Sequence, residues 1–293
     1  MRAVSLHPDV LVVTSALLQV KCVIVRGAVG VDEEGAETST PVKVLTVPGA
    51  GGHSEGSGVS RGESFLIDSP VLPDELEALP ALLEQARFPA PSGLLATHGD
   101  WDHLLGRLAF PAAALGVAES TAERLGESPG EAQRQLRTFD EELMIERPRP
   151  LSLGSLQGLP VPGRCEVGDR ELELHPTGGH TGDGMAVLAP WAGVLVVGDY
   201  LSSVELPGLG QGGGVEAYRE TLERLRPLLT RVEQVVPGHG PVLDSDRALV
   251  LLEEDLAYLR DLAGRGSEAE LPSGRRGATQ RRLHAENAAA LLQ

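Results

Sequence analysis

The sequence is poor in aromatic residues and in positive charge. Phe, Trp and Tyr make up only 3% of its 293 residues, so a nucleic acid would find few side chains on which its bases could stack. The formal net charge is -17, whereas nucleic-acid binding depends on Lys and Arg that neutralise phosphates. We therefore expect no nucleic-acid partner, although the charge alone does not exclude one.

Cysteines and long apolar runs are also scarce. Cys22 and Cys165 are the only cysteines, and their spacing rules out a Cys-x-x-Cys motif, so we interpret them as buried or incidental thiols. No apolar run reaches the ~18 residues that predict a membrane span. Residues 10–20 are apolar, but little positive charge precedes them and no small-residue cleavage site is clear, which favours a strand over a signal peptide. These features predict a cytoplasmic protein without a membrane segment.

One dense cluster of imidazoles and carboxylates stands out from this background. His98, Asp100, Asp102 and His103 directly follow the apolar residues 93–96. Such a run predicts a buried strand, so the cluster should lie where that strand ends and the chain turns. Imidazole and carboxylate are common ligands of zinc, manganese and iron. Because the ligands alternate along the turn, it could offer them in two directions, which suits two metal ions better than one.

Three further histidine or aspartate positions share this setting, at the end of a short apolar strand and beside glycine. They are His180, Asp199 and His239. Glycine lets the backbone turn tightly after a strand, so the repeated setting predicts that these side chains join the cluster. The remaining histidines lack the full setting, and we interpret them as structural, surface or loop residues: His7, His53, His175 and His284.

The hydrophobic pattern predicts strands followed by helices in both halves of the chain. Strands are expected at residues 10–18, 21–26, 41–47, 64–67, 93–97, 116–118, 171–174, 185–188, 194–197 and 232–236. Helices are expected at residues 73–86, from a capping box at Ser128 to Leu143, and at 215–229, 246–263 and 278–292, with Gly264 as a stop signal. This order predicts an α/β protein with two sheets packed face to face and helices outside.

The chain resembles the metallo-beta-lactamase superfamily. Its signature, His-x-His-x-Asp-His followed by a His, an Asp and a His at later strand ends, is similar to the four motifs above, in the same order. The resemblance covers roughly residues 10–263. It implies an αββα sandwich of two mixed sheets in residues 1–264, with residues 265–293 as a basic linker and a helix packed on the same domain.

The resemblance also implies a site with two divalent metal ions, with zinc as the first choice and manganese or iron as alternatives. By the family pattern, one ion would take His98, Asp100 and His180, the other Asp102, His103 and His239, and Asp199 would bridge them. Asp102 would also orient the attacking hydroxide.

Asp100 departs from the family pattern, which mostly has histidine at that position. A carboxylate shifts the preference of a site toward manganese or iron. The family's diiron flavoproteins have glutamate there, which opens a redox interpretation, but they carry a flavodoxin-like domain, and only two predicted helices follow His239 here. Alternatively, Asp100 does not coordinate a metal ion, which would leave a site that binds metal more weakly or holds only one ion.

The function implied is that of a metal-dependent hydrolase, acting through a metal-activated water on a small ester, thioester or lactone. The alternatives are an iron-dependent oxidoreductase similar to persulfide dioxygenases or diiron proteins, a phosphodiesterase or nuclease, and a binding protein without catalysis. The segment between Asp199 and His239 is too short for the large inserted domain of the family's RNA-processing branch.

Substrate specificity should reside in segments outside the common core. Candidates are the acidic and glycine-rich loops of residues 27–62, the loop of residues 201–214 and the C-terminal tail. The tail holds a basic cluster made of Arg275, Arg276, Arg281 and Arg282. We favour a solvated patch over its alternatives, which are binding of a carboxylate or phosphate and contact with a second subunit of a homodimer.

Overall fold

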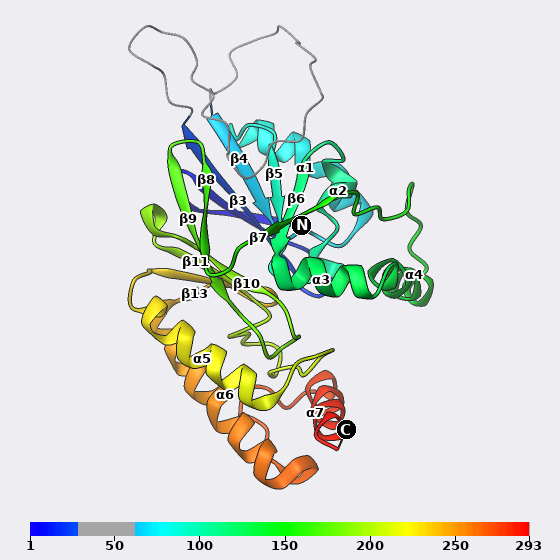
Figure 1. Cartoon of the computed structure of the whole chain (residues 1–293), viewed down its shortest axis with the longest axis vertical. Helices are drawn as coiled ribbons and strands as arrows, with labels where there is room; N and C mark the ends of the chain where they lie inside the picture. Colours follow the sequence, from blue (N-terminus) through cyan, green and yellow to red (C-terminus); the bar gives the residue numbers. More distant parts are fainter. Residues whose placement is uncertain (29–61, 293) are drawn as a thin grey trace, which may run out of the picture.

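The computed structural model describes residues 1–28 and 62–292, and their strands form two sheets (Figure 1). The first sheet has, in spatial order, β1 (Arg2–His7), β2 (Val10–Thr14), β3 (Lys21–Ala28), β4 (Gly62–Ile67), β5 (Gly93–Leu95), β6 (Ala114–Ala118) and β7 (Leu156–Leu159). The second runs from β13 (Leu243–Asp244) through β12 (Gln234–Pro237), β11 (Val194–Gly198), β10 (Met185–Ala189) and β9 (Arg170–Pro176) to β8 (Gly163–Val167). Strands β4 to β7 pair in parallel, as do β11 and β12, and the other neighbours are antiparallel, so both sheets are mixed.

Helices cover the outer faces of both sheets. The first sheet carries α1 (Pro73–Gln85), α2 (Gly106–Ala109), α3 (Glu119–Glu127) and α4 (Glu131–Leu143), and the second carries α5 (Val215–Leu229) and α6 (Ser245–Arg265). Helix α7 (Ala278–Ala290) packs against α6 and the segment that follows it. Three short 3₁₀ helices complete the described elements: η1 (Trp101–His103), η2 (Pro190–Ala192) and η3 (Gly266–Glu268). The predicted αββα sandwich is therefore confirmed.

Side-chain alternation along the strands divides the apolar residues into separate layers. In β2, Val10 and Val12 face the core between the sheets, whereas Leu11 and Val13 face the helices outside the first sheet. This is the period of two that a strand imposes on its side chains. Burial of each such side chain stabilises the fold by about 1.5–3 kcal/mol. The layer of side chains between the sheets therefore fixes the positions of the two sheets, and of the loops at their edges, relative to each other.

Two predicted helix boundaries are wrong. Ser128 does not cap a helix start: it ends α3, with its amide donating to the Arg124 carbonyl, and α4 begins after Gly130, whose φ is 77°. Gly264 does not stop α6, which continues to Arg265 and ends at Gly266 with a φ of 57°. In both cases the glycine that adopts the left-handed conformation marks the boundary, because that conformation carries little strain only for glycine.

Other elements differ from the sequence pattern as well. Strands β1, β7, β8 and β13 and helices α2 and α3 were not predicted. Strand β1 is a largely exposed edge strand, β7 lies in a proline- and glycine-rich stretch, and β13 and α2 are only two and four residues long. The predicted strand at 41–47 and His53 lie outside the described residues.

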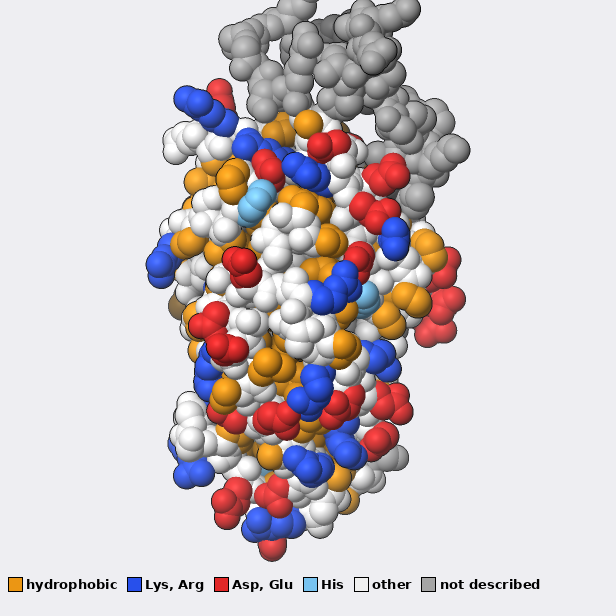
Figure 2. All heavy atoms as spheres, turned by 90° about the vertical axis from the view of Figure 1, so that its left-hand side faces the viewer, with side chains coloured by type: hydrophobic (Ala, Val, Ile, Leu, Met, Phe, Trp, Pro, Cys, Tyr) orange, Lys and Arg blue, Asp and Glu red, His pale blue; other side chains and the backbone are white. Residues whose placement is uncertain are grey.

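Within residues 1–28 and 62–292, no helix is both long and apolar enough to cross a membrane. Figure 2 shows acidic and basic side chains interspersed over one face of the molecule.

Candidate metal centre

The turn after β5 carries the predicted cluster and is tied to the neighbouring strand. Asp68, at the end of β4, accepts hydrogen bonds from the amide of Thr97 to Oδ1 (2.8 Å) and from its hydroxyl to Oδ2 (2.9 Å). Two residues further on, the amide of Gly99 donates to Oδ2 of Asp183 (2.9 Å). The chain then closes into η1, which places Asp102 and His103 on its inner side, both buried. The direction of the cluster is therefore fixed by carboxylates outside it.

The seven predicted site residues lie together, with Asp199, which directly follows β11, among them. The Nε2 atom of His103 lies 3.2 Å from Asp199 Oδ1, and those of His180 and His239 each lie 3.4 Å from Oδ2. The Nε2 atom of His98 is 3.8 Å from the same Oδ2. The ends of β5, β9, β11 and β12 thus meet at one edge of the sandwich, as the strand-end positions predicted.

These residues form two groups, one on each side of Asp199. In one, potential ligand atoms of His98, His180 and Asp199 all lie within 4.8 Å of one another. In the other, the same holds for Asp102, His103 and His239. A further group adds Glu205, which the sequence did not single out, to Asp199 and His239. The geometry therefore offers two neighbouring places where a cation could bind.

Each of the four histidines turns Nε2 toward Asp199 and Nδ1 toward a partner outside the group. The Nδ1 partners are Thr97 Oγ1 for His98 (3.1 Å), Asp68 Oδ2 for His103 (3.0 Å), the Gly208 carbonyl for His180 (2.9 Å) and the Leu18 carbonyl for His239 (2.9 Å). Metal-ligating histidines almost always make such a second contact, which fixes the ring orientation and the tautomer. The rings are therefore held with one nitrogen free to coordinate.

Several inward-facing atoms of this site have no hydrogen-bond partner although they are buried. They are Nε2 of His98, His103 and His180, and Oδ1 of Asp199. A buried polar atom without a partner costs about 1–3 kcal/mol, and four of them in one place indicate a group that the protein chain itself does not supply. Imidazole and carboxylate donors suit zinc, manganese or iron, so the residues fit divalent metal ions.

The carboxylates strongly perturb the imidazoles. Burial lowers the pKa of His180 and His239, but nearby carboxylates outweigh it: Asp100 and Asp199 raise the pKa of His180 to about 9, and Asp199, Glu205 and Asp102 raise that of His239 to about 10. Conversely, burial raises the pKa of Asp199, yet the surrounding imidazoles hold it well below its usual value. The site thus favours bound positive charge, supplied by protons when no metal is present.

Asp100 differs from the other carboxylates because a cation already holds one of its oxygens. Its Oδ1 accepts a hydrogen bond from Arg124 Nη2 on α3 (2.7 Å), and its Oδ2 lies 3.4 Å from His180 Nε2 and 3.6 Å from His98 Nε2. Arg124 also binds Asp183 through Nη1 (2.7 Å). One oxygen of Asp100 therefore remains directed at the first group.

The sequence matches a family model described as the metallo-beta-lactamase superfamily over residues 59–239, more than half of the chain. The chain belongs to the metallo-beta-lactamase superfamily. Members of this superfamily are metallo-hydrolases, as the resemblance of the motifs predicted. No curated protein matches the sequence.

Several solved structures share the fold of this chain at low sequence identity. A metallo-beta-lactamase from Pontibacter korlensis is 16% identical with a TM-score of 0.57, covering 89% of this chain and 99% of its own. A metallo-beta-lactamase family protein from Thermus thermophilus is 19% identical with a TM-score of 0.63, covering 98% and 95%. The sec-alkylsulfatase Pisa1 from Pseudomonas sp. is 15% identical with a TM-score of 0.66, and this chain, matched over 99% of its length, spans about half of that protein (49%).

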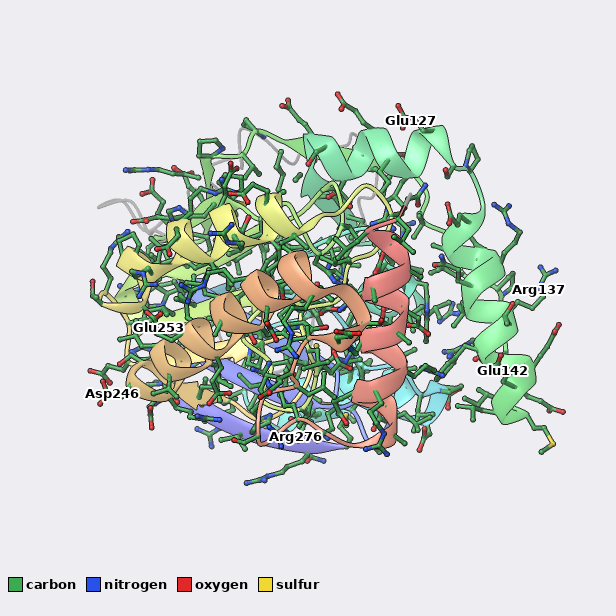
Figure 3. All side chains as sticks on the ribbon, turned by 90° about the horizontal axis from the view of Figure 1, so that it is seen from below. Glu127, Arg137, Glu142, Asp246, Glu253 and Arg276 are labelled. Carbon is green, nitrogen blue, oxygen red and sulfur yellow. The ribbon has the colours of Figure 1, made fainter. Side chains whose placement is uncertain are left out.

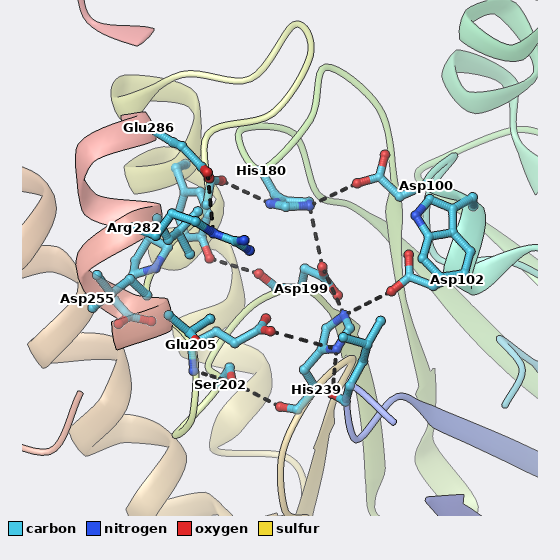
Figure 4. A pocket seen from close by; sticks show the side chains of 18 residues that line it. Asp100, Asp102, His180, Asp199, Ser202, Glu205, His239, Asp255, Arg282 and Glu286 are labelled. Atoms are coloured by element: carbon cyan, nitrogen blue, oxygen red, sulfur yellow. Dashed lines mark hydrogen bonds and ion pairs between the residues drawn. The ribbon is translucent and has the colours of Figure 1, made fainter. Parts of the chain in front are cut away.

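A cavity of about 250 Å³ opens over the metal centre (Figure 4). Its floor includes Asp100, Asp102, His180, Asp199 and His239, so both groups of potential ligands can be reached from it. One wall comes from the loop after β11, including Glu205 and Leu206, together with α7, which packs against that loop through Asn287. The superfamily match ends at residue 239, so α7 belongs to the part of the chain outside the matched region.

The basic cluster of the tail is not one solvated patch. Arg275 is only 3% exposed, forms an ion pair with Asp255 (2.6 Å) and donates to the carbonyl of Glu205 (2.8 Å). Arg282 lines the cavity, whereas Arg276 lies on the outside of the molecule (Figure 3). For Arg275 the interpretation as a solvated residue is therefore wrong, because the side chain fixes the loop that forms one cavity wall.

Sequence reasoning missed several residues that position the site. Asp68 had the same strand-end setting as the ligands, which could have drawn attention to it, but Arg124, Asp183 and Glu205 carry no local signal. The histidines interpreted as structural or surface residues lie in other contacts: His7 pairs with Asp9, His175 with Glu173, and His284 with Tyr258.

Proposed function

We propose that this chain hydrolyses a small substrate with the help of two divalent metal ions. In this proposal His98, Asp100 and His180 would hold one ion, Asp102, His103 and His239 would hold the other, and Asp199 would be shared by both. The observation that carries it is the set of buried, unpartnered Nε2 atoms of His98, His103 and His180 around the Asp199 carboxylate. When bound, such a pair of ions lowers the pKa of a water molecule and stabilises negative charge on a substrate oxygen.

Asp102 is the residue that we assign to the attacking water. It lines the cavity, and its Oδ2 lies 3.4 Å from His239 Nε2, so its carboxylate stands between a metal ligand and the substrate space. A carboxylate in this place orients the water through a hydrogen bond and accepts its proton as the new bond forms. Burial of the site limits competing bulk water and strengthens these interactions.

The substrate class that we propose is a small ester, thioester or lactone. The cavity volume of about 250 Å³ accommodates a small molecule, and the ligand residues form its floor. A carbonyl group placed above Asp199 would have the water held by Asp102 beside it. Zinc is the first candidate for the metal, and the Asp100 carboxylate makes manganese and iron the alternatives.

A second candidate is an iron-dependent oxidoreductase. The observation in its favour is again Asp100, whose Oδ2 faces His98 and His180 in place of a third imidazole. Harder, negatively charged ligands favour iron over zinc. Metal analysis of anaerobically purified protein, together with oxygen uptake, separates the candidates: zinc or manganese without oxygen uptake excludes the oxidoreductase.

The exchange of Asp102 for alanine tests the hydrolase. We expect Asp102→Ala to lower turnover of the best ester or lactone by at least ~100-fold, the scale of a lost general base. Asp246→Ala, at the exposed start of α6, is the matched control and should keep full turnover (Figure 3). Turnover of the Asp102 variant at the rate of the control would exclude the proposed mechanism.

We further propose that the protein works in a reducing compartment such as the cytoplasm, and that residues 265–293 form part of the same domain. Cys22 and Cys165 are free and buried, which is typical of proteins that need no disulfide. The contacts of Asn287 with Pro207 and Leu209 support the single domain, since they join α7 to the loop after β11.

A further inference from the structure

Helix α7 presents one face to the cavity above the metal centre. Four of its residues line the cavity at positions spaced as on a single helix face: Thr279, Arg282, Leu283 and Glu286. Residues three, four and seven positions apart lie above one another on an α-helix. The wall of the cavity is therefore a continuous helix surface, and it lies outside the residues matched by the superfamily.

Helix α7 is anchored through residues beside this face, which fixes the direction of the face. Asn287 is fully buried, and its side chain donates to the carbonyl of Pro207 (2.7 Å) and accepts from the amide of Leu209 (2.9 Å). His284 is paired with the Tyr258 hydroxyl of α6 (3.0 Å). With these contacts in place, the side chain of Arg282 extends from α7 into the cavity (Figure 4).

Arg282 is the sole lysine or arginine among the described residues that line this cavity. Two of the acidic residues there already have cationic partners, since Asp100 is paired with Arg124 and Asp255 with Arg275. The partner of Arg282 itself is Glu286, at 3.5 Å. Both of these side chains are well exposed, at 77% and 60%, and an exposed ion pair of this kind contributes little. A bound anion can therefore replace Glu286 at the guanidinium.

The cavity also has an apolar part. Leu206 and Leu283 line it and belong to one apolar cluster, and Leu18 lines it with 41% of its surface exposed. Apolar side chains in the lining of a cavity are what a small ligand with an apolar part contacts. The cavity thus offers three environments to one small molecule: the metal centre, an apolar wall and one guanidinium.

We propose that Arg282 forms a subsite for an anionic group of the substrate, so that the substrate is a small apolar ester, thioester or lactone that also carries a carboxylate or sulfonate away from the bond to be cleaved. This inference rests on the proposed hydrolase function. The guanidinium donates two parallel hydrogen bonds to such an oxyanion, which adds orientation to charge attraction. Arg282 binds and orients, and the reacting atoms lie at the metal centre.

Three p-nitrophenyl esters of equal acyl length test the subsite in the metal-loaded full chain: the pentanoate, the glutarate hemiester and the 4-sulfobutanoate. We expect a lower KM for the two anionic esters, and Arg282→Gln should raise that KM by about tenfold, leaving kcat and the KM of the pentanoate unchanged. Arg282→Lys should recover part of the loss. The relative KM of the carboxylate and sulfonate esters identifies which anion the subsite prefers.

The matched control is Arg281→Gln, which removes an exposed arginine from the next position of α7, outside the cavity lining. It should leave all three KM values unchanged. Glu286→Gln should lower the KM of the anionic esters, because the competing carboxylate is gone. Equal effects of Arg282→Gln on neutral and anionic esters, or no effect on either, would overturn the proposal.

Binding without turnover separates this inference from the hydrolase proposal. By isothermal titration, metal-loaded wild-type protein should bind glutarate about tenfold more tightly than pentanoate, and Arg282→Gln should abolish that preference. Failure of all three esters to react, with this preference intact, would reject hydrolysis of such esters and keep the anion subsite. Equal binding of glutarate and pentanoate by wild type would reject the subsite itself.

Discussion

Arg124 and Asp100 form a hydrogen-bonded ion pair at the edge of the metal centre, with Nη2 of Arg124 2.7 Å from Oδ1 of Asp100. The other oxygen of Asp100 faces His98 and His180. Because Arg124 also binds Asp183, it joins the turn after β5 to the loop that carries His180. The Asp100 carboxylate thus has its own cationic partner, which an imidazole at this position would not need.

Removal of the Arg124 guanidinium should therefore weaken metal binding at the group formed by His98 and His180. We expect Arg124→Gln to lower the affinity for the more weakly held ion by about 10- to 100-fold, the usual effect of losing a contact that orients a ligand. Competition with a chromophoric chelator measures this. Arg137→Gln, on the outer side of α4, is the control (Figure 3). Equal affinities of the two variants would mean that Arg124 does not hold a ligand in place.

Gly238 provides a steric test of the bridging residue. A Cβ at this position would collide with Oδ1 of Asp199 and lie 3.0 Å from Cε1 of His103. Gly238→Ala should therefore displace Asp199 and lower turnover by about 100-fold, the cost of a misplacement near 1 Å. Gly178→Ala is the matched control, since nothing lies within 4 Å of its Cβ. The metal content and turnover of both variants are measured. A fully active Gly238→Ala variant would argue against a role for Asp199.

Asn287 should help to hold the His180 ring in place, although it does not contact that ring. It binds the residues on both sides of Gly208, whose carbonyl holds His180 Nδ1 at 2.9 Å. Asn287→Ala should lower stability by about 1–3 kcal/mol, because two buried backbone groups lose their partner, and should weaken metal binding by about tenfold. Thermal unfolding measured with and without metal separates the effects. A loss of stability without a loss of metal affinity would show that α7 only supports the fold.

Metal binding should depend steeply on pH. In the metal-free chain the pKa of His180 is about 9 and that of His239 about 10, so both imidazoles carry a proton at pH 7, which a metal ion must displace. Affinity should therefore rise with pH until those pKa values are passed, by about tenfold per pH unit for each displaced proton. Chelator competition between pH 6 and 9 checks this. A dissociation constant independent of pH in that range would contradict the protonated metal-free site.

The sequence was sufficient to predict the sandwich and the grouping of the seven residues, because those signals are local. Each of His180, Asp199 and His239 follows a short apolar strand and is flanked by glycine, and strands of one sheet end at a common edge. The boundaries of α4 and α6 were wrong because several glycines compete for each boundary, and only the folded chain determines which one adopts a positive φ.

The residues that orient the ligands could not be predicted, because their partners are distant in sequence. Arg124 lies 59 residues from Asp183, and Asn287 lies 80 residues from Pro207. Helix α3, which carries Arg124, is short and buries only Thr121, so no apolar stripe marked it as a helix. The roles of Arg275 and Arg282 likewise depend on where the tail packs. Both lie in the same basic stretch, so the sequence could not predict that Arg275 is buried and that Arg282 lines the cavity.

The most direct test of the account is the number and position of metal ions in the protein. Anaerobically purified chain should contain two divalent ions by elemental analysis, and anomalous diffraction should place one beside His98 and His180 and the other beside His103 and His239, with Asp199 between them. The expected result is full occupancy of both positions, with loss of the ions abolishing turnover. A single ion, or two ions that Asp199 does not contact, would contradict the central claim.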